Sequence, residues 1–362
     1  MSNQNSTYYN ATILCNKLNV NSSDYQAVFE DTTSQNIVNQ TGNYKFAIER
    51  FSMEGHNIPI WIPNISSGNT TTYSVLLTYY NIASPKTFTS DEIFLQYIPL
   101  NNVPVSDPSY YFVYNYDVFC QMLNNAFTTA RSNLQGKMAN VTMSTEAPYI
   151  VYDGSSNLFS FYLDAQGYVS YTAGEQITLT VNNELYNLLK TFNFKMNTTL
   201  PNYRDLVPIN KISNYIAGIK DPYNLGTNIN CWICTQMQPT TNNCWSPVQS
   251  LLFASDSISL KPEIVGNVSV VGTGSALGSG NSNNTQTMIT DLVLDLNRSS
   301  DYIDMLVYQP SIHRWVDLSD SQNLKTFRFS VWWLNKFNQQ RYPILLANNG
   351  CITLKVLFQK KI

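Results

Sequence analysis

The sequence feature that most limits the possible folds is an apolar strand pattern near the C-terminus, in the stretch CITLKVLFQKKI. Apolar side chains occupy every second position there, which is the period of a β-strand with one buried face. Terminal segments usually fray unless neighbouring strands hold them. The pattern therefore predicts a fold in which the last strand lies inside a sheet, beside a strand from the start of the chain. The four apolar residues are Ile352, Leu354, Val356 and Phe358.

The composition agrees with a β-rich protein that has many polar loops. Charged residues make up only 12% of the 362 residues, about half the usual share, while aromatic residues reach 13%. No stretch approaches the ~18 consecutive apolar residues of a membrane span. The beginning, MSNQNSTYYN, lacks the cationic and apolar regions of a secretory signal, and six cysteines make no disulfide framework. We expect synthesis in a reducing compartment without a signal peptide and with free thiols.

Strand patterns dominate both ends of the chain, whereas the middle is mixed. Val118, Met122 and Phe127 follow helical spacing after Asn115, and two apolar runs around Asp153-Gly154 indicate a hairpin. Phe327, Phe329, Val331 and Trp333 alternate as in a strand with one buried face, whereas residues 200–245 show no regular pattern and are expected to be irregular.

These patterns predict a mainly β protein that consists of a single jelly roll, a two-sheet antiparallel β-sandwich, with an inserted α+β domain. The jelly roll comprises residues 26–100 plus 236–362, and the insertion comprises residues 101–235. Residues 1–25 are polar and rich in Asn, which favours an N-terminal arm that becomes ordered on a partner.

No residue pattern indicates catalysis, a cofactor or a metal. The two histidines, His56 and His313, lie in no recognisable motif. Cys231 and Cys234 form the sequence CWIC, and Cys244 follows, but the fourth ligand that a zinc site needs is missing. We therefore predict buried apolar thiols at this stretch and no enzymatic function.

Positive charge gathers near the end of the chain although the net charge is −3. From residue 311 onward eight Lys and Arg stand against two Asp. This asymmetry is typical of a surface that faces an acidic neighbour or packaged nucleic acid, although ordinary solvated charges would give the same count. We select four of these cations as candidate assembly contacts: Arg341, Lys355, Lys360 and Lys361.

Several stretches, taken in order along the chain, are similar to one known family. They are AVFEDTTSQ and NYKFAIERFSMEGHNIPIWIP near the start, YYFVYNYDVFCQMLNNAFTTA, APYIVYDGSSNLFSF and NNELYNLLKTF in the middle, and FRFSVWWLN, YPILL and ITLKVLFQKK at the end. Together they resemble the penton (minor capsid) proteins of virophages and Polinton-like viruses, in the adenovirus-type double-jelly-roll capsid lineage. The CWIC stretch and residues 271–287 match nothing in that family.

The resemblance implies a structural capsid protein located in the virion. Such a protein forms homopentamers at the five-fold vertices of an icosahedral dsDNA virus and contacts the surrounding major capsid protein trimers. It implies no catalytic residues and no cofactor. Packaged DNA or a host receptor are further candidate partners. The alternative function is a virion spike or a receptor- or glycan-binding β-module, in which exposed loop aromatics would form the ligand site.

Overall fold

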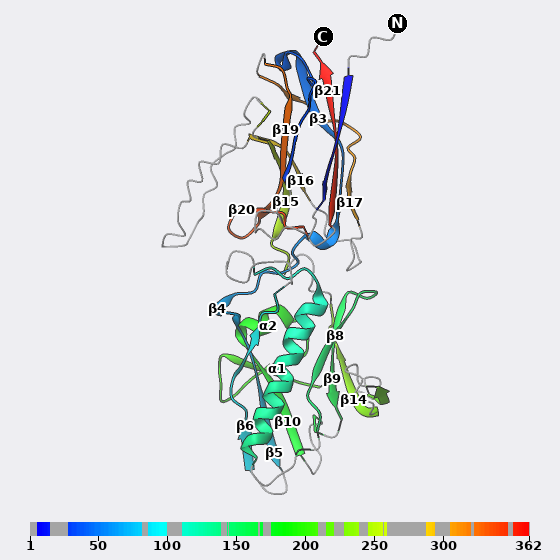
Figure 1. Ribbon diagram of the computed structural model, residues 1–362. Coiled ribbons are helices and arrows are strands. Elements are labelled where there is room, and N and C mark those ends of the chain that lie inside the picture. The colour runs from blue at the N-terminus through cyan, green and yellow to red at the C-terminus, as the bar shows by residue number, and fades with distance from the viewer. Residues whose placement is uncertain are drawn as a thin grey trace.

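The molecule is elongated, with a β-sandwich at one end and a mixed α/β part at the other (Figure 1). Below, the sandwich means strands β1–β3 and β15–β21, and the inserted unit means strands β4–β14 with helices α1 and α2. Strand β1 begins and strand β21 ends at the tip of the sandwich that is far from the inserted unit. The structure is a computed structural model that describes residues 6–14, 28–81, 86–99, 111–138, 143, 145–165, 167–168, 175–208, 215–220, 228–238, 245–255, 257–258, 287–293, 305–319, 322–346 and 350–361.

The first sheet of the sandwich contains the C-terminal strand in its interior. Its order is β1 (Ser6–Leu14), β21 (Cys351–Lys360), β3 (Tyr44–Glu54) and β17 (Met305–Tyr308), and β18 (Val316–Asp317) also pairs with β3. Strand β21 is antiparallel to both β1 and β3. The alternating apolar residues of β21 are all at most 3% exposed. The predicted position of the last strand, beside a strand from the start of the chain, is therefore confirmed.

The second sheet of the sandwich packs face to face against the first. Its order is β16 (Thr287–Val293), β15 (Val248–Ser255), β19 (Thr326–Asn335) and β2 (Val28–Thr32), and β20 (Arg341–Pro343) pairs with β19. Aromatic rings meet between the sheets, with centroids 4.8 Å apart for Phe51 and Phe253. The predicted buried face of β19 is confirmed, since its four residues are at most 1% exposed. The prediction of a mainly β, two-sheet antiparallel fold holds, while the jelly-roll connectivity stays a prediction.

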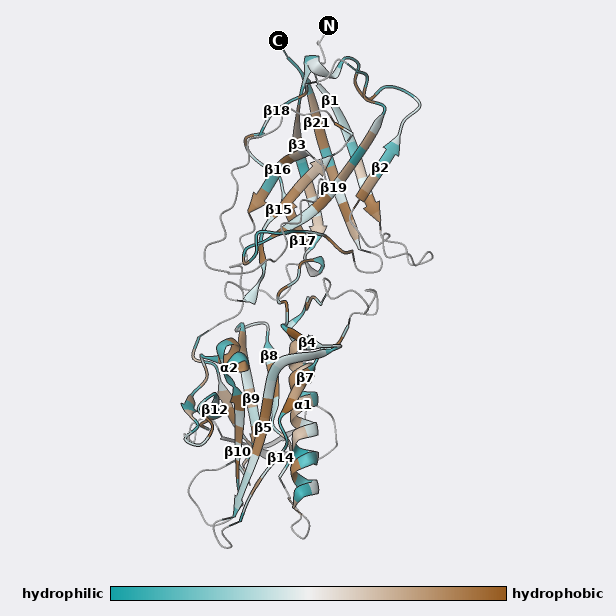
Figure 2. Ribbon diagram, turned by 90° about the vertical axis from the view of Figure 1, so that its left-hand side faces the viewer, coloured by the Kyte–Doolittle hydropathy of each residue, from teal (hydrophilic) through white to brown (hydrophobic). Residues whose placement is uncertain are grey.

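The inserted unit consists of two antiparallel sheets with helix α1 (Tyr116–Lys137) packed against them (Figure 1). One sheet has the order β11 (Phe194–Met196), β12 (Tyr203–Leu206), β10 (Glu175–Asn182), β5 (Thr70–Asn81) and β4 (Ile65–Ser67), with β6 (Lys86–Thr89) and β7 (Ile93–Gln96) also paired to β5. The other has the order β13 (Tyr215–Lys220), β14 (Asn228–Thr235), β9 (Leu158–Asp164) and β8 (Tyr149–Asp153). Helix α2 (Asn183–Leu189) follows β10 directly. Figure 2 shows hydrophobic stretches in strands of both parts of the molecule.

Helix α1 forms where its sequence signals predict. The Asn115 side chain caps it by accepting a hydrogen bond from the Asp117 backbone N–H, and Lys137 lies in its last turn. Its apolar stripe is buried, and Phe127 is fully inaccessible. The predicted hairpin is also present as β8 and β9, and Asp153 accepts hydrogen bonds from the two serines of its turn. These bonds hold the pKa of the Asp153 carboxyl below its usual range.

The predicted placement of residues 65–96 in the jelly roll is wrong. Strands β4 to β7 pair within the inserted unit, and β5 lies next to β10. The reason is the pairing of apolar faces: Leu77 faces Leu179 and Val75 faces Val181 across the two strands, and all four side chains are at most 1% exposed. The strand pairing thus favours an insertion that begins near residue 60; the division into a jelly roll and an inserted domain is kept as a proposal.

Two further expectations differ from the structure. The arm predicted for residues 1–25 is wrong for residues 6–14, which form β1 with a continuous register to β21, while the rest of that segment lies outside the described residues. Tyr9, Ala11 and Ile13 face the core, a period-2 pattern that the surrounding polar residues obscure. The irregular structure predicted for residues 200–245 is also wrong in part, because β12, β13 and β14 lie there.

Residues 58–62 lead from the sandwich into the inserted unit, and residues 111–114 precede α1 within the inserted unit; the two segments meet antiparallel at Trp61 and Val113. Neighbouring side chains of these segments enter opposite cores. Phe112 packs in the sandwich, with its ring centroid 5.4 Å from that of Trp333. Trp61 packs in the inserted unit, with its ring centroid 5.3 Å from that of a phenylalanine of α1. The junction therefore contributes side chains to both cores and ties them together.

Candidate functional site

The CWIC stretch is a strand, and its two cysteines point to opposite faces of that strand. Cys234 lies in the core of the inserted unit, and Cys231 pairs with Asp164 of β9. Residues three apart in a strand face opposite ways, so the two thiols do not share one ligand. Both side chains are buried, which confirms the prediction of buried thiols there; Cys244 lies outside the described residues. Among the residues that the structure describes, no group of three or more His, Cys, Asp or Glu could hold a metal ion.

His313 takes part in a local surface contact. Its Nε2 lies 2.7 Å from a carboxylate oxygen of Glu49, and its ring packs against Trp315. Glu49 sits at the register shift between β3 and β21, where a bulge turns the side chain outward. The side chain of His56 lies outside the described residues. In the described ranges no helix is long and apolar enough to cross a membrane.

The structure does not bring the four candidate cations together. Arg341 is exposed on β20, near the end of the sandwich that meets the inserted unit (Figure 1). Lys360 is exposed at the opposite tip. Lys361 is held by its own chain, since its Nζ donates to backbone oxygens of Gly42 and Leu318 at 3.1 and 3.3 Å.

Lys355 lies on the outer face of the first sheet, above the ring of Tyr8 at 4.5 Å from its centroid. Lys45 lies similarly above Trp315 on the same sheet, at 4.4 Å. Such cation–π contacts occupy both lysines within the chain. The four cations therefore define no single basic surface, and their role as assembly contacts stays a prediction.

At each side of the sandwich a polar contact links the two sheets. On one side, the Tyr9 hydroxyl donates to Asp31 at 2.5 Å, joining β1 to β2. Burial and the bond to Asp31 raise the pKa of Tyr9 well above its ordinary value. On the other side, Arg314 donates to Asp291 of β16 at 2.8 Å. These contacts fix the edges of the two sheets relative to each other.

The edge strands of the first sheet differ in charge from those of the second. Strands β1 and β17 contain no charged residue, whereas β2 carries Glu30 and Asp31 and β16 carries Asp291. Edge strands commonly carry charges that oppose pairing with another chain. The uncharged edges also expose apolar side chains, with Leu14 at 68% and Val307 at 59%. These two edges are therefore the best candidate assembly surface, and the charge pattern of the sequence did not predict them.

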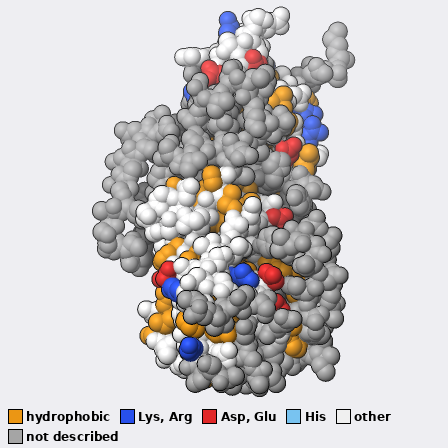
Figure 3. Space-filling model, turned by 60° about the horizontal axis from the view of Figure 1, so that its bottom comes forward, with side chains coloured by type: hydrophobic (Ala, Val, Ile, Leu, Met, Phe, Trp, Pro, Cys, Tyr) orange, Lys and Arg blue, Asp and Glu red, His pale blue; other side chains and the backbone are white. Residues whose placement is uncertain are grey.

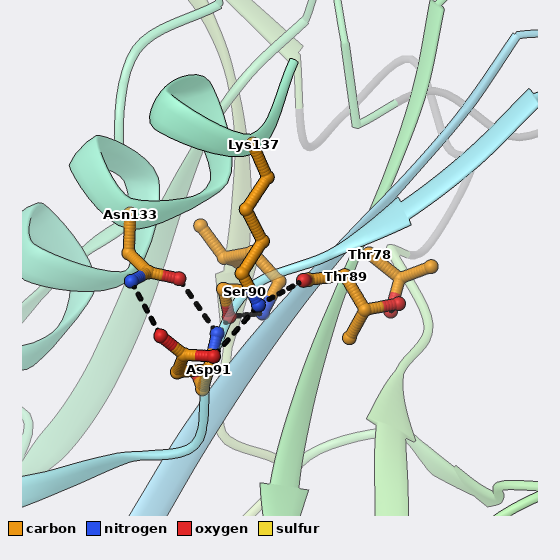
Figure 4. A network of polar contacts seen from close by, with 7 residues as sticks. Thr78, Thr89, Ser90, Asp91, Asn133 and Lys137 are labelled. Carbon is orange, nitrogen blue, oxygen red and sulfur yellow. Dashed lines mark hydrogen bonds and ion pairs between the residues drawn. The ribbon is translucent and has the colours of Figure 1, made fainter. Parts of the chain in front are cut away.

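The far end of the inserted unit has a different character. Figure 3 shows scattered positive and negative side chains among hydrophobic and polar ones on the described surface there. The clearest polar network is a clamp formed by Asp91, Asn133 and Lys137 (Figure 4). Lys137 donates to the Asp91 carboxylate at 2.7 Å, and Asn133 donates to its other oxygen at 2.7 Å. The clamp fastens the end of α1 to the β6–β7 connection, which is a structural role.

The chain belongs to the family of the Sputnik minor capsid protein V18/19, because the model of that family matches residues 7–360. The resemblance to virophage minor capsid proteins is thereby confirmed. As a member of this family the chain is a structural component of a viral capsid.

Three known proteins illustrate the relationship. The protein V18 of the Sputnik virophage is 31% identical over 136 residues, which cover 34% of this chain and 78% of V18. A chain of the Sputnik virophage particle, solved by cryo-EM at 3.5 Å, superposes with a TM-score of 0.65 at 23% identity, covering 98% of both chains. The crystal structure of the mavirus penton protein superposes with a TM-score of 0.56 at 14% identity, covering 98% of this chain and 99% of that one. The two superpositions show that the fold is shared.

Proposed function

We propose that this chain is the penton of an icosahedral virophage-type capsid, a homopentamer that occupies each five-fold vertex. The observation that carries the proposal is the end-to-end match in fold to the mavirus penton protein, within a family of minor capsid proteins. The role is structural and involves no chemical step. Around each vertex, the pentamer contacts trimers of the major capsid protein.

The shape of the chain supports this role. The inserted unit covers one end of the sandwich, and the start of β1 and the end of β21 lie at the other, so the long sides of the sandwich remain for neighbouring subunits (Figure 1). A five-fold ring with its axis along the sandwich would place all inserted units on one face of the shell. We propose that this is the outer face, where the inserted units project from the vertex.

The test is cryo-EM of particles assembled from this chain and its major capsid protein. Five copies around each five-fold axis, with the inserted units outward, are expected. Light scattering on the purified chain should give a species of five times the chain mass of 41.0 kDa. Density for the chain at another symmetry axis, or a solution trimer, would contradict the proposal.

A further inference from the structure

We propose that neighbouring copies in the ring meet through the two uncharged edges of the first sheet, β1 of one copy against β17 of the next. The inference rests on the proposed pentamer and goes beyond it by naming the contact. The β1 edge means Ser6–Leu14, and the β17 edge means Met305–Tyr308.

The first observation is the contrast between the edges of the two sheets. The β1 edge has nine residues without a charge and the β17 edge has four, while both edges of the other sheet carry carboxylates. A charged edge resists a second chain because pairing would strip water from the charge. An uncharged edge with exposed apolar side chains lacks that protection and favours association. The first sheet is thus open to a neighbour along β1 and along β17, whereas β18, which pairs with another part of β3, carries Asp317.

The second observation is that the exposed side chains of the two edges lie at the same height. Thr12 pairs with Thr353, Thr353 pairs with Ser52, and Ser52 pairs with Val307, so one row runs across the whole sheet. The hydroxyls of Ser52 and Thr353 lie 2.5 Å apart, which places this row on one face. Two residues further, Leu14 and Met305, which are 68% and 57% exposed, end the next outward-facing row.

The third observation concerns symmetry. Rotation about an axis parallel to the strands keeps the height of every residue, so Thr12 of one copy would meet Val307 of the next, and Leu14 would meet Met305. A contact between two different surfaces of the same chain is heterologous, and it closes into a ring when the rotation divides a full turn. The occupant of each edge is therefore a second copy of this chain.

Several charged groups that the structure describes on these sides already have partners within the chain. Arg314 is paired with Asp291, and Asp317 of β18 lies 3.5 Å from Lys361. The Lys355 cation sits over the Tyr8 ring. Charges that are already satisfied within one subunit need not be stripped of their partners when a neighbour approaches.

The test uses a short bismaleimide cross-linker on the full chain with Cys15→Ser and Cys351→Ser, so that the thiol that follows β1 in the sequence and the thiol of β21 do not compete. Thr12→Cys and Val307→Cys are made separately and together. Each single variant alone should give no cross-link, because a heterologous contact brings unlike residues together. A mixture of the two single variants should give dimers, and the double variant should give a ladder up to the pentamer.

A matched control pair is Glu30→Cys with Val293→Cys, on the two edges of the second sheet; it should give no ladder. A pentamer by light scattering that lacks the Thr12–Val307 cross-link overturns this contact and leaves the ring standing. A ladder from the control pair also overturns it, as does cross-linking in particles to the major capsid protein alone. A species other than the pentamer overturns the ring itself, and this proposal with it.

A second experiment does not depend on cross-linking chemistry. Val307→Lys puts a charge on the β17 edge, where the side chain is 59% exposed, so we expect the subunit fold to be retained. It should raise the concentration at which the pentamer half-dissociates at least about tenfold. Val293→Lys is the matched control, a more exposed valine at 72% on the edge of the other sheet, and it should leave that concentration unchanged. Equal dissociation in both variants would overturn the assignment.

Discussion

The sandwich and the inserted unit build their hydrophobic cores from different arrangements of strands and helices. In the sandwich two sheets pack face to face, and the first sheet contains strands from both ends of the chain. The inserted unit packs its sheets around helix α1, and most of its strands pair with strands nearby in sequence. Folding of the sandwich therefore requires strands from both ends of the chain, whereas folding of the inserted unit requires only one continuous segment.

Truncation of a buried aromatic side chain should have the largest effect on stability, and it tests whether the two parts unfold separately. Phe329→Ala in the sandwich and Phe127→Ala in α1 each remove a fully buried ring, and each should lower the free energy of unfolding by about 3–5 kcal/mol. Urea denaturation measures the loss, and hydrogen exchange with mass spectrometry locates it. Each variant should lose protection mainly in its own part. Equal loss throughout both parts would mean that the junction couples them into one cooperative unit.

Deletion of residues 1–14 should destabilise the sandwich and spare the inserted unit. The deletion removes the buried side chains of Ala11 and Ile13 and leaves β21 without one neighbour, so we expect a loss of at least ~2 kcal/mol. Hydrogen exchange should show β21 amides losing protection. Deletion of residues 1–5 alone is the control and should leave the stability unchanged. An intact sandwich after the longer deletion would return β1 to the role of a dispensable arm.

A hydrogen bond at the junction provides the next test. The hydroxyl of Tyr97 donates to the Phe112 carbonyl at 3.0 Å. Tyr97→Phe should lower the stability at pH 7 by about 1 kcal/mol. Burial raises the pKa of Tyr97 to about 12, above its unfolded value near 10, so its contribution is present below pH 10 and is lost as pH rises toward 12. Denaturation of both proteins across this range should show their stabilities converging.

The control for that experiment is Tyr80→Phe, which alters an exposed ring on β5 and should leave the stability at pH 7 unchanged. If Tyr97→Phe also has no effect at pH 7, the hydrogen bond to the junction makes no net contribution.

The smallest effect should come from the surface clamp at the end of α1. Hydrogen bonds from Lys137 and Asn133 hold the pKa of Asp91 below its ordinary value. A lowered carboxyl pKa stabilises the fold above about pH 4, and this stabilisation is lost as pH falls below that value. Lys137→Gln should therefore cause a small, salt-dependent fall in the urea midpoint at neutral pH and a weaker acid dependence. A midpoint that is equally acid-sensitive in both proteins would exclude the clamp as the source.

Much of the fold could be predicted from the sequence because periodicity is a local property. The alternation in β21 and β19 and the stripe of α1 are visible in the residues themselves. The partner of a strand is not visible in this way. The pattern of β5 is the same whether it pairs with β3 or with β10, and only the matching of Leu77 to Leu179 in three dimensions decides.

The candidate site was harder to predict for a related reason. Counting charges led to Arg341 and the terminal lysines, which the structure separates or pairs within the chain. The contrast between charged and uncharged edges has meaning only once the edge strands are known. The absence of charge in Ser6–Leu14 and Met305–Tyr308 was readable, but nothing in the sequence marks these segments as two edges of one sheet.

The interior position of β21 has a consequence for how the protein is made. During synthesis the inserted unit emerges complete well before residues 351–360, so it is able to fold while the sandwich still lacks a central strand. Until β21 arrives, β1 and β3 have a gap between them that another nascent chain could fill. Emergence of β21 from the ribosome is thus the step that completes the first sheet of the sandwich.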